Sequence, residues 1–425
     1  MAKPKLALIP AAQGSKFYSV LPSSGVGDFT FTRSGSATRI NSQGLIETVG
    51  NGVSRLNYPL IDGKVVGCPS HLLEPQRSNS FQQSNQFDTT WQISAAGISV
   101  TPNQVGVGGS TDAWKLTEGT YSGEHFIRQT PNVGGVVSVS VYAKAGTNDF
   151  IYLRGVNGGA NKRTWFNLSN GTVGTSQGIS AEMISMGNGW YRCVMVLDHQ
   201  TAFEYYIATS KADGVSSYQG DNGFIYIQNS QLEQGSYPTS YIPTSGSVVT
   251  RSAETANNSG DASTFNDSEG VLMVEISGFN ETVSANNWIS LTDGTTNQNN
   301  YVSIQQDTSG NIISRVRVNG VNSAVLYSTI IDQSLSSKIA IKYKLNDFSL
   351  YVNGFEYDSD NVGSIFSTNT LSKLSFDYNS LSNPFYGNTK QVQYYDSALT
   401  DSDLETLTSW VSFSDMANGQ LYTIQ

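Results

Sequence analysis

Residues 231–244 of this chain read QLEQGSYPTSYIPT, and this stretch decides how the sequence divides. Gly235, Pro238 and Pro243 favour tight turns, because glycine readily adopts positive φ and proline fixes φ at about −65°. Strand-forming sequence lies on both sides of the stretch. We therefore interpret it as a turn-rich connector that leaves one β-module and enters a second.

The composition predicts an all-β protein. The chain has 425 residues, enough for two or three domains, and 38% of them are hydrophobic, enough for packed cores. Charged residues make up only 14%, well below the usual quarter, whereas Gly (41), Tyr (22) and Phe (18) are plentiful. Gly, Asn, Ser and Thr are poor helix formers, while aromatic residues favour strands and recur in every segment, which disfavours disorder. We expect tandem β-sandwiches built from short strands.

Charge and hydropathy exclude several classes of partner. The net charge of −10 disfavours nucleic acid and anionic membrane surfaces, since neither attracts an acidic chain. No apolar run approaches the roughly 20 residues of a membrane helix, so we expect no membrane insertion. Lys3 and Lys5 precede only four apolar residues before Pro10, too few for an export signal. We therefore expect the protein to be made and assembled in a cytosol.

The two cysteines, Cys68 and Cys193, lie far apart in the sequence, and neither belongs to a CxxC pair. This spacing disfavours a disulfide framework and a thiolate zinc site. We expect both to be buried as small hydrophobic side chains.

Turn signals divide the chain into four parts. Residues 29–32, FTFT, alternate as a half-buried strand does, and Asp62-Gly63 marks a hairpin turn. Many short strands at regular spacing, with no helical run between them, indicate a sandwich or jelly roll. Residues 257–263, NNSGDAS, are typical of a flexible linker. The predicted parts are an extended, strand-rich N-terminal anchoring segment (1–80), a first sandwich of jelly-roll type (81–246), a linker (247–268), and a second sandwich with a helix and tail (269–425).

Two local patterns in the last part predict its details. Asn353-Gly354 is a strong signal for a two-residue hairpin turn. Thr400 is a good N-cap residue, and acidic side chains follow it at positions 401, 403 and 405, where they suit a helix N-terminus. We therefore predict one short helix that begins after Thr400 and runs through Trp410. The last 15 residues form a tail to which the sequence assigns no role.

Several motifs in the first sandwich, and one just before it, resemble those of bacteriophage virion proteins that carry carbohydrate-binding-like jelly rolls. They are the stretches LEPQRSN (73–79), GWYRC (189–193), SYQGD (217–221), GFIYI (223–227) and the connector 231–244. With Trp91, the resemblance spans about residues 81–245. Ser78 stands where the pattern usually has Thr, which keeps the hydroxyl.

Two later stretches resemble laminin-G/concanavalin A-like lectin domains. The run AIKYKLNDFSLYVNG (340–354) is similar to their back-sheet hairpin, and YYDSALTDSDL (394–404) is similar to their closing strand and helix. The resemblance covers about residues 270–410. It implies a curved sandwich that in some members binds sugars through calcium, so calcium is possible here, although we expect no cofactor.

Together the resemblances imply a structural component of a phage virion: a head or tail fibre, or a capsid decoration. The N-terminal segment would contact other virion proteins, and the sandwiches would bind host surface glycans during adsorption. Because fibres of this kind are commonly trimers, we expect a homotrimer, in which avidity makes weak sites useful. Two alternatives stay open: a glycan depolymerase or lyase, and a purely structural capsid decoration that binds only capsid.

The sequence holds no complete catalytic constellation. The glucanases that share the lectin fold carry the pattern Glu-x-Asp-x-x-Glu, whose two outer carboxylates act as nucleophile and general acid. The stretch EISG (275–278) supplies Glu275 but no partner carboxylate after it, and EYDSDN (356–361) ends in Asn361. The three histidines form no HExxH or related spacing, and no Gly-x-Ser-x-Gly is present. We therefore predict that the protein is not an enzyme.

Sugar sites usually combine an aromatic face for a pyranose with polar side chains for its hydroxyls. Aromatic residues that alternate along strands also occur in cores. Each aromatic candidate can therefore be either a sugar-binding side chain or a core residue. The carbohydrate-binding candidates in the first sandwich are Trp165, Tyr205, Tyr152 and Arg163, and those in the second are Trp288 and Asp293.

Overall fold

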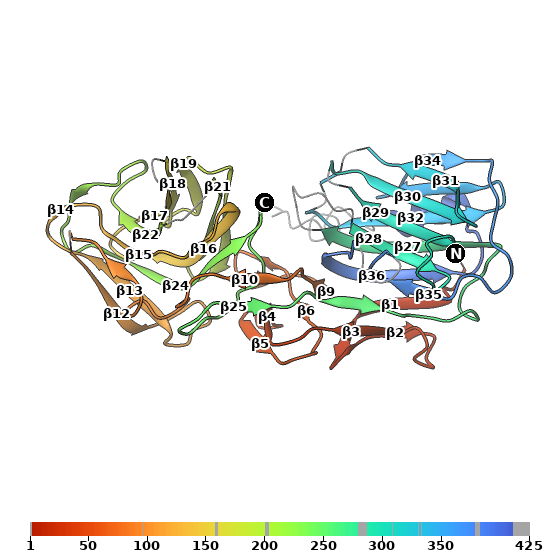
Figure 1. Cartoon of the computed structure of the whole chain (residues 1–425), viewed down its shortest axis with the longest axis horizontal. Coiled ribbons are helices and arrows are strands. Elements are labelled where there is room, and N and C mark those ends of the chain that lie inside the picture. The colour runs from red at the N-terminus through yellow and green to blue at the C-terminus, as the bar shows by residue number, and fades with distance from the viewer. Residues whose placement is uncertain are drawn as a thin grey trace.

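The computed structural model describes residues 2–95, 97–157, 160–199, 204–278, 287–307, 309–329, 331–332, 334–378 and 383–410. Two β-sandwiches form the ends of an elongated molecule, and short strands from the N-terminal segment lie between them (Figure 1). The predicted all-β class, with tandem sandwiches and one short C-terminal helix, is confirmed. The predicted tail lies outside the described residues.

Two six-stranded antiparallel sheets form the first sandwich. The sheet that we call the β17 sheet contains, in order, β11 (Gln92–Ile93), β15 (Phe126–Gln129), β22 (Glu204–Ser210), β17 (Phe150–Asn157), β18 (Ala160–Asn167) and β19 (Thr172–Ser176). The facing β16 sheet contains β12 (Ile98–Gln104), β13 (Ala113–Glu118), β24 (Phe224–Gln234), β16 (Gly135–Ala145), β21 (Trp190–His199) and β20 (Ser180–Gly187). Alternate side chains of the two sheets meet in one buried apolar core.

The second sandwich pairs an 11-stranded sheet with a five-stranded one. The large sheet contains β26 (Thr255–Asn257), β3 (Phe29–Thr32), β2 (Lys16–Leu21), β1 (Leu6–Gln13), β36 (Gly387–Tyr395), β27 (Glu269–Gly278), β32 (Ser337–Lys344), β33 (Phe348–Val352) and β34 (Phe355–Asp360), and β9 (Ser70–Leu73) and β6 (Leu56–Asn57) attach beside β36. The small sheet contains β31 (Val321–Tyr327), β30 (Ile312–Val318), β29 (Tyr301–Gln306), β28 (Asn287–Thr292) and β35 (Lys373–Ser375).

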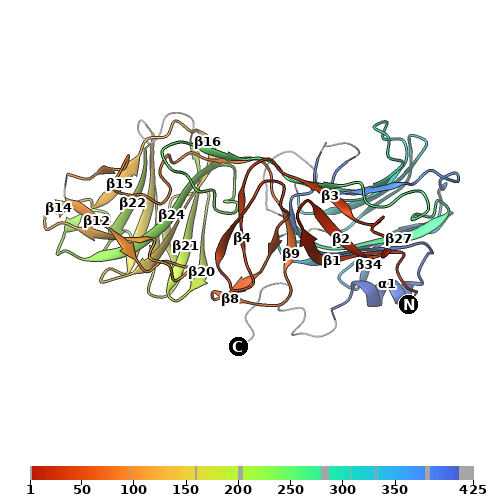
Figure 2. The ribbon, with the colours of Figure 1, turned by 90° about the horizontal axis from the view of Figure 1, so that it is seen from below.

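The first strands of the chain complete the second sandwich. In the pairing of β1 with β36, Leu6 lies opposite Tyr394 and Leu8 opposite Val392. Leu6, Leu8 and Phe17 are fully buried in the same core as the apolar residues of β27 and β32. The N-terminal segment therefore packs on a neighbouring module of its own chain (Figure 2).

The remaining short strands lie mostly between the sandwiches: β4 (Ala37–Ile40) pairs with β5 (Ile46–Val49), β7 (Leu60–Ile61) with β8 (Lys64–Val65), and β10 (Arg77–Asn79) with β25 (Val249–Arg251), while β14 (Ser122–Gly123) and β23 (Tyr218–Gln219) pair at the far end of the first sandwich (Figure 1). Ile40, Ile46 and Leu60 pack against Tyr142 and Trp190 on the outer face of the β16 sheet. This second apolar cluster joins the N-terminal segment to the first sandwich.

The predicted Asp62-Gly63 hairpin turn makes the closest contact in this junction. Both residues have positive φ, and the turn joins β7 to β8. A Cβ on Gly63 would lie 2.1 Å from the backbone of Gly187, so only glycine permits this approach.

Residues 247–268, expected to be a solvated linker, contribute β25 and β26. Arg251, Glu254 and Ala256 within them are buried. This segment, although rich in Asn, Ser and Gly, therefore forms strands that are held in place by a few buried charged and apolar side chains.

The hairpin turn and the helix predicted for the last part of the chain are both present, and only the end of the helix differs. Asn353 and Gly354 both have positive φ and connect β33 to β34. In helix α1 (Asp401–Thr408), the Thr400 hydroxyl accepts a hydrogen bond from Asp403 N at 3.2 Å. The helix ends at Thr408 rather than Trp410, because Ser409 is extended while its N–H still bonds to Glu405 O.

The cysteine prediction holds for one residue only. Cys193 is fully buried in the first core, and burial raises the pKa of its thiol. Cys68 is exposed, so the expectation that both are interior was wrong for it. It lies in the connection between β8 and β9, where the preceding Gly67 is exposed as well.

A network of five buried charged side chains lies where the N-terminal segment meets the connector between the sandwiches: Arg33, Arg55, Glu74, Arg251 and Glu254. Arg33 Nη1 lies 2.7 Å from Glu254 Oε1. Arg55 Nη2 lies 2.8 Å from Glu74 Oε2 and also pairs with Glu254, and Arg251 Nη1 lies 2.7 Å from Glu74 Oε2. Each carboxylate thus faces two guanidinium groups.

Backbone and hydroxyl groups complete the coordination of Glu74. Ser240, in the connector that follows β24, donates to Glu74 from its backbone N–H at 2.7 Å and from its hydroxyl at 2.6 Å. Arg251 also donates to Pro75 O at 2.7 Å. Buried charges with this many partners are tolerated, whereas removal of one partner leaves an uncompensated charge. Burial alone raises the pKa of Glu74, but Arg251 and Arg55 outweigh it and lower the pKa to about 2.

We predict that Glu74 makes the fold acid-sensitive. Because its folded pKa lies below the ordinary 4.5, its contribution is complete above pH 4.5 and is lost as the pH falls towards 2. The shift corresponds to about 3 kcal/mol. The Glu74→Gln variant should therefore unfold at lower denaturant concentration at pH 7, and the gap to the unmodified protein should shrink on acidification.

Denaturant midpoints followed by circular dichroism between pH 2 and 7 measure this gap. The control is Glu182→Gln, since Glu182 is exposed on β20. The informative quantity is the difference in midpoint between the Glu74→Gln variant and the unmodified protein at each pH. The pH dependence of either protein alone also contains the opposite contribution of Glu233, whose pKa is raised by burial. A gap that stays constant with pH would contradict the assignment.

Candidate carbohydrate-binding site

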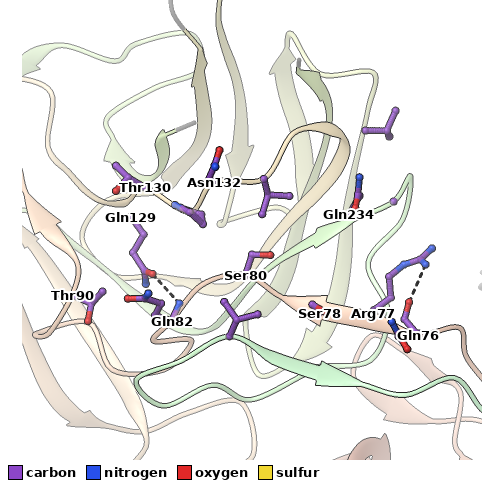
Figure 3. A pocket seen from close by; sticks show the side chains of 15 residues that line it. Gln76, Arg77, Ser78, Ser80, Gln82, Thr90, Gln129, Thr130, Asn132 and Gln234 are labelled. Carbon is purple, nitrogen blue, oxygen red and sulfur yellow. Dashed lines mark hydrogen bonds between the residues drawn. The ribbon is translucent and has the colours of Figure 1, made fainter. Parts of the chain in front are cut away.

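An open groove with a volume of about 1140 Å³ lies beside the first sandwich, between β10, the end of β24 and the turn that enters β16. Figure 3 shows polar side chains around it from all these segments. The residues that line it are Gln76, Arg77, Ser78, Ser80, Gln82, Thr90, Gln129, Thr130, Pro131, Asn132, Val133, Val136, Gln234, Gly235 and Val248. We call it the amide groove.

Neutral side chains dominate this lining. Gln76, Gln82, Asn132 and Gln234 are exposed amides, and each carries both donors and an acceptor. Sugar hydroxyls likewise donate and accept, so amides can match them in either direction. The valines of the lining, with Val248 the most exposed, add a small apolar area.

Gln129 forms a fixed part of the wall. It lies at the end of β15 and is almost fully buried. Its Oε1 accepts from Gln82 N at 3.0 Å (Figure 3). Its Nε2 donates to Gln83 O at 3.1 Å. These bonds hold residues 82 and 83 beside the groove.

Arg77 provides the positive charge of the groove. Its Nη1 donates to Gln76 O at 3.2 Å, and its guanidinium carbon lies 5.4 Å from the ring centroid of Tyr237. Gly235 has a φ of 141°, and a Cβ there would lie 2.9 Å from Arg77 Nη2. Glycine at this position therefore leaves room for the arginine.

The groove lacks the groups that break glycosidic bonds. Among the described residues that line it, there is no Asp, Glu, His or Cys. Hydrolysis of a glycoside ordinarily needs two carboxyl groups on either side of the bond. The arrangement can therefore hold a neutral polar ligand but supplies no general acid or base.

The structure places Trp165, Tyr152 and Arg163 on the outer face of the β17 sheet. The rings of Trp165 and Tyr152 lie 5.3 Å apart, and both are buried. Trp165 Nε1 donates to Val215 O at 3.0 Å, so these two rings form a small packed cluster rather than an open platform.

Tyr205 points the opposite way, into the first core. Its ring lies 6.3 Å from Phe81, and its hydroxyl donates to Val133 O at 3.1 Å, next to the amide groove. Burial raises the pKa of this phenol. Because side chains alternate along a strand, Tyr206 takes the outer position instead.

Trp288 and Asp293 belong to the second sandwich and share no site with the others. Trp288 is buried on β28, with ring centroids 3.9 Å from Tyr378 and 5.8 Å from Tyr301. Asp293 accepts from Thr295 N at 2.9 Å, which fixes a turn after β28.

The groups considered for catalysis and for calcium lie apart from the groove. Glu275 accepts from Gln391 Nε2 at 2.7 Å within the second sandwich. Within the described part of the chain, no group of three or more His, Cys, Asp or Glu is placed to hold a metal ion. One oxygen cluster in the first sandwich contains an ammonium group: Lys211 Nζ lies 2.7 Å from Glu118 Oε1, 2.8 Å from Asn148 Oδ1 and 2.5 Å from Asp221 Oδ1.

The sequence interpretation did not select the residues of the amide groove as binding candidates. A signal was present, because the stretches 73–79 and 231–244 contribute Gln76, Arg77, Ser78, Gln234 and Gly235 to the lining. They were interpreted as family motifs and as a connector. These two stretches, distant in sequence, meet at one groove because β10 lies beside the end of β24, where Ser80 N donates to Leu232 O at 2.8 Å.

In the described ranges, no helix is long and apolar enough to cross a membrane.

Comparison with known proteins gives weak likenesses in structure alone. No protein-family model and no curated protein matches the chain. The sialidase module CBM40 of Ruminococcus gnavus, bound to α2,3-sialyllactose, is 16% identical with a TM-score of 0.31 over 36% of this chain and 92% of that chain. The NanB sialidase of Streptococcus pneumoniae is 16% identical with a TM-score of 0.29, over 36% of this chain and 26% of that chain. A heptameric SAP-like pentraxin of Limulus polyphemus is 16% identical with a TM-score of 0.29, over 35% and 72%.

We predict that Gln129 stabilises the wall of the groove. Gln129→Leu leaves Gln82 N–H and Gln83 C=O without their bonds to this side chain, which should cost about 1–3 kcal/mol. Gln82→Leu is the matched control, because Gln82 uses its backbone in this contact and its side chain is exposed. Thermal unfolding should show a clear loss for the first variant and little change for the second. Equal melting temperatures would contradict the role of Gln129.

Proposed function

We propose that this protein binds glycans without cleaving them, and that the amide groove of the first sandwich is the binding site. The observation that carries the proposal is the lining of the groove: amides, hydroxyls and one arginine, with no carboxylate among the described lining residues. Such groups bind hydroxyl-rich ligands by networks of neutral hydrogen bonds, while the apolar area contacts the C–H faces of a sugar ring.

The size of the groove suits a short oligosaccharide. A volume of about 1140 Å³ lies slightly above the range of ordinary ligand sites, which runs from about 300 to 1,000 Å³. Open, solvent-exposed hydrogen bonds contribute little each, so a single groove binds weakly. Several copies on one particle would raise the overall affinity by multivalency.

We include in the same proposal that the protein is part of a phage virion. The similarity of residues 73–79, 189–193 and 231–244 to phage virion motifs supports a virion protein that contributes to adsorption on host surface glycans, as a homotrimeric fibre or decoration. Since β1 and β2 already complete the second sandwich, contacts with other virion proteins would use their exposed apolar side chains, Ile9, Tyr18 and Val20.

We predict that neutral oligosaccharides bind the amide groove. The double variant Asn132→Ala/Gln234→Ala removes two exposed amides and should weaken binding roughly tenfold, since each hydrogen bond contributes about 0.5–1.5 kcal/mol. A glycan array identifies the ligand, and calorimetry then compares the variants. Asn322→Ala, an exposed position on β31, is the control and should bind as the unmodified protein does. An unchanged affinity in the double variant would remove the groove from the proposal.

We also predict no turnover. Incubation with host capsule or lipopolysaccharide should release no new reducing ends, because no carboxyl pair lines the groove. Release that disappears on substitution of one carboxylate would favour the depolymerase alternative. Tight capsid binding with a silent glycan array would favour the purely structural decoration.

A further inference from the structure

We propose a second binding site, for the carboxylate group of an acidic sugar, on the outer face of the β17 sheet, where the carboxylate of Glu124 now occupies the position that the ligand would take. The site consists of Arg154, Arg163 and the hydroxyl of Tyr152. It shares no residue with the amide groove, and it rests on the proposed function only for the choice of a sugar as the ligand.

The first observation is the strand register. Arg154 on β17 lies directly opposite Arg163 on β18. Two like charges in such a cross-strand pair repel each other, so this arrangement is unfavourable unless an anion lies between them. Tyr152, two residues earlier on β17, points to the same face.

The second observation is the anion that bridges this pair. Glu124 follows β14, and its Oε1 lies 2.7 Å from Arg163 Nη2, while its Oε2 binds Arg154 Nη1. Two guanidinium groups thus hold the two oxygens of one carboxylate, a geometry that proteins use to recognise carboxylate ligands.

The third observation is an excess of donors. Tyr152 Oη, Arg154 Nε and Arg163 Nε are buried and have no hydrogen-bond partner among the described residues. Tyr152 is fully buried and lies two residues from Arg154 on the same face of β17. Burial, followed by the charge of Glu124, raises the pKa of its hydroxyl. One internal carboxylate leaves these donors unused, whereas a ligand with ring and hydroxyl oxygens as well as a carboxylate can accept from them.

The site is reachable from solvent. The side chains of Glu124, Arg163 and Arg154 retain 23%, 18% and 13% of their accessible surface. Glu124 belongs to the short connector between β14 and β15, so its side chain can turn outward without breaking a strand. Tyr206 flanks the site, with its ring centroid 4.5 Å from the guanidinium carbon of Arg154.

The test compares glucuronate with glucose, two sugars that differ in the carboxylate. We expect the unmodified protein to bind glucuronate weakly, because Glu124 competes for the same donors. Glu124→Gln should bind glucuronate at least tenfold more tightly, with a rise in melting temperature that glucose does not cause. Arg163→Met in the Glu124→Gln background should abolish the gain. Arg39→Met, which removes a surface arginine paired with Glu47, is the control and should leave it intact.

Two further comparisons separate ligand binding at this site from a structural effect and from binding in the amide groove. Tyr152→Phe in the Glu124→Gln background removes only the unpartnered hydroxyl, so it should reduce glucuronate affinity severalfold without lowering the melting temperature; a purely structural hydroxyl would give the opposite pattern. The gain should also survive Asn132→Ala/Gln234→Ala, which separates this site from the groove. Calorimetry that shows no glucuronate binding by a folded Glu124→Gln variant, or equal binding of glucose, would overturn the proposal.

Discussion

The buried charge network of Arg33, Arg55, Glu74, Arg251 and Glu254 is the interaction on which the arrangement of this molecule depends. Its members come from segments that would otherwise have little reason to meet: the residue after β3, the residues just before β6 and just after β9, the end of β25 and the approach to β26. Charges removed from water require partners in defined positions. The network therefore specifies how the N-terminal segment and the connector lie together.

The groove and the arginine site illustrate two different uses of polar side chains on one scaffold. In the amide groove, neutral groups face open solvent, where they can exchange water for sugar hydroxyls at small cost. On the β17 sheet, charged groups are partly buried and already hold an anion of their own. The first arrangement suits neutral polar ligands, and the second suits an anionic one.

Local patterns in the sequence were sufficient to predict individual turns and the helix, but not which strands pair with each other. Asn353-Gly354 and the Thr400 cap were predictable because turn and helix-end preferences act over a few residues. That β1 pairs with β36 was not, because strand register between distant segments leaves no local signal. The same limit explains the candidate site: a choice between Tyr205 and Tyr206 needs the position of the facing sheet, and the groove needs the contact of β10 with β24.

The contact of β1 with β36 also constrains the order in which the molecule can mature during synthesis. Residues 81–246 contain nearly all of the first sandwich, so that module can form while the ribosome is still translating the rest. The second sandwich has to wait, because its sheet closes only when the strand at positions 387–395 emerges to receive the one at positions 6–13. Until then the opening strands keep an unpaired edge, which makes a newly made chain vulnerable to aggregation before release.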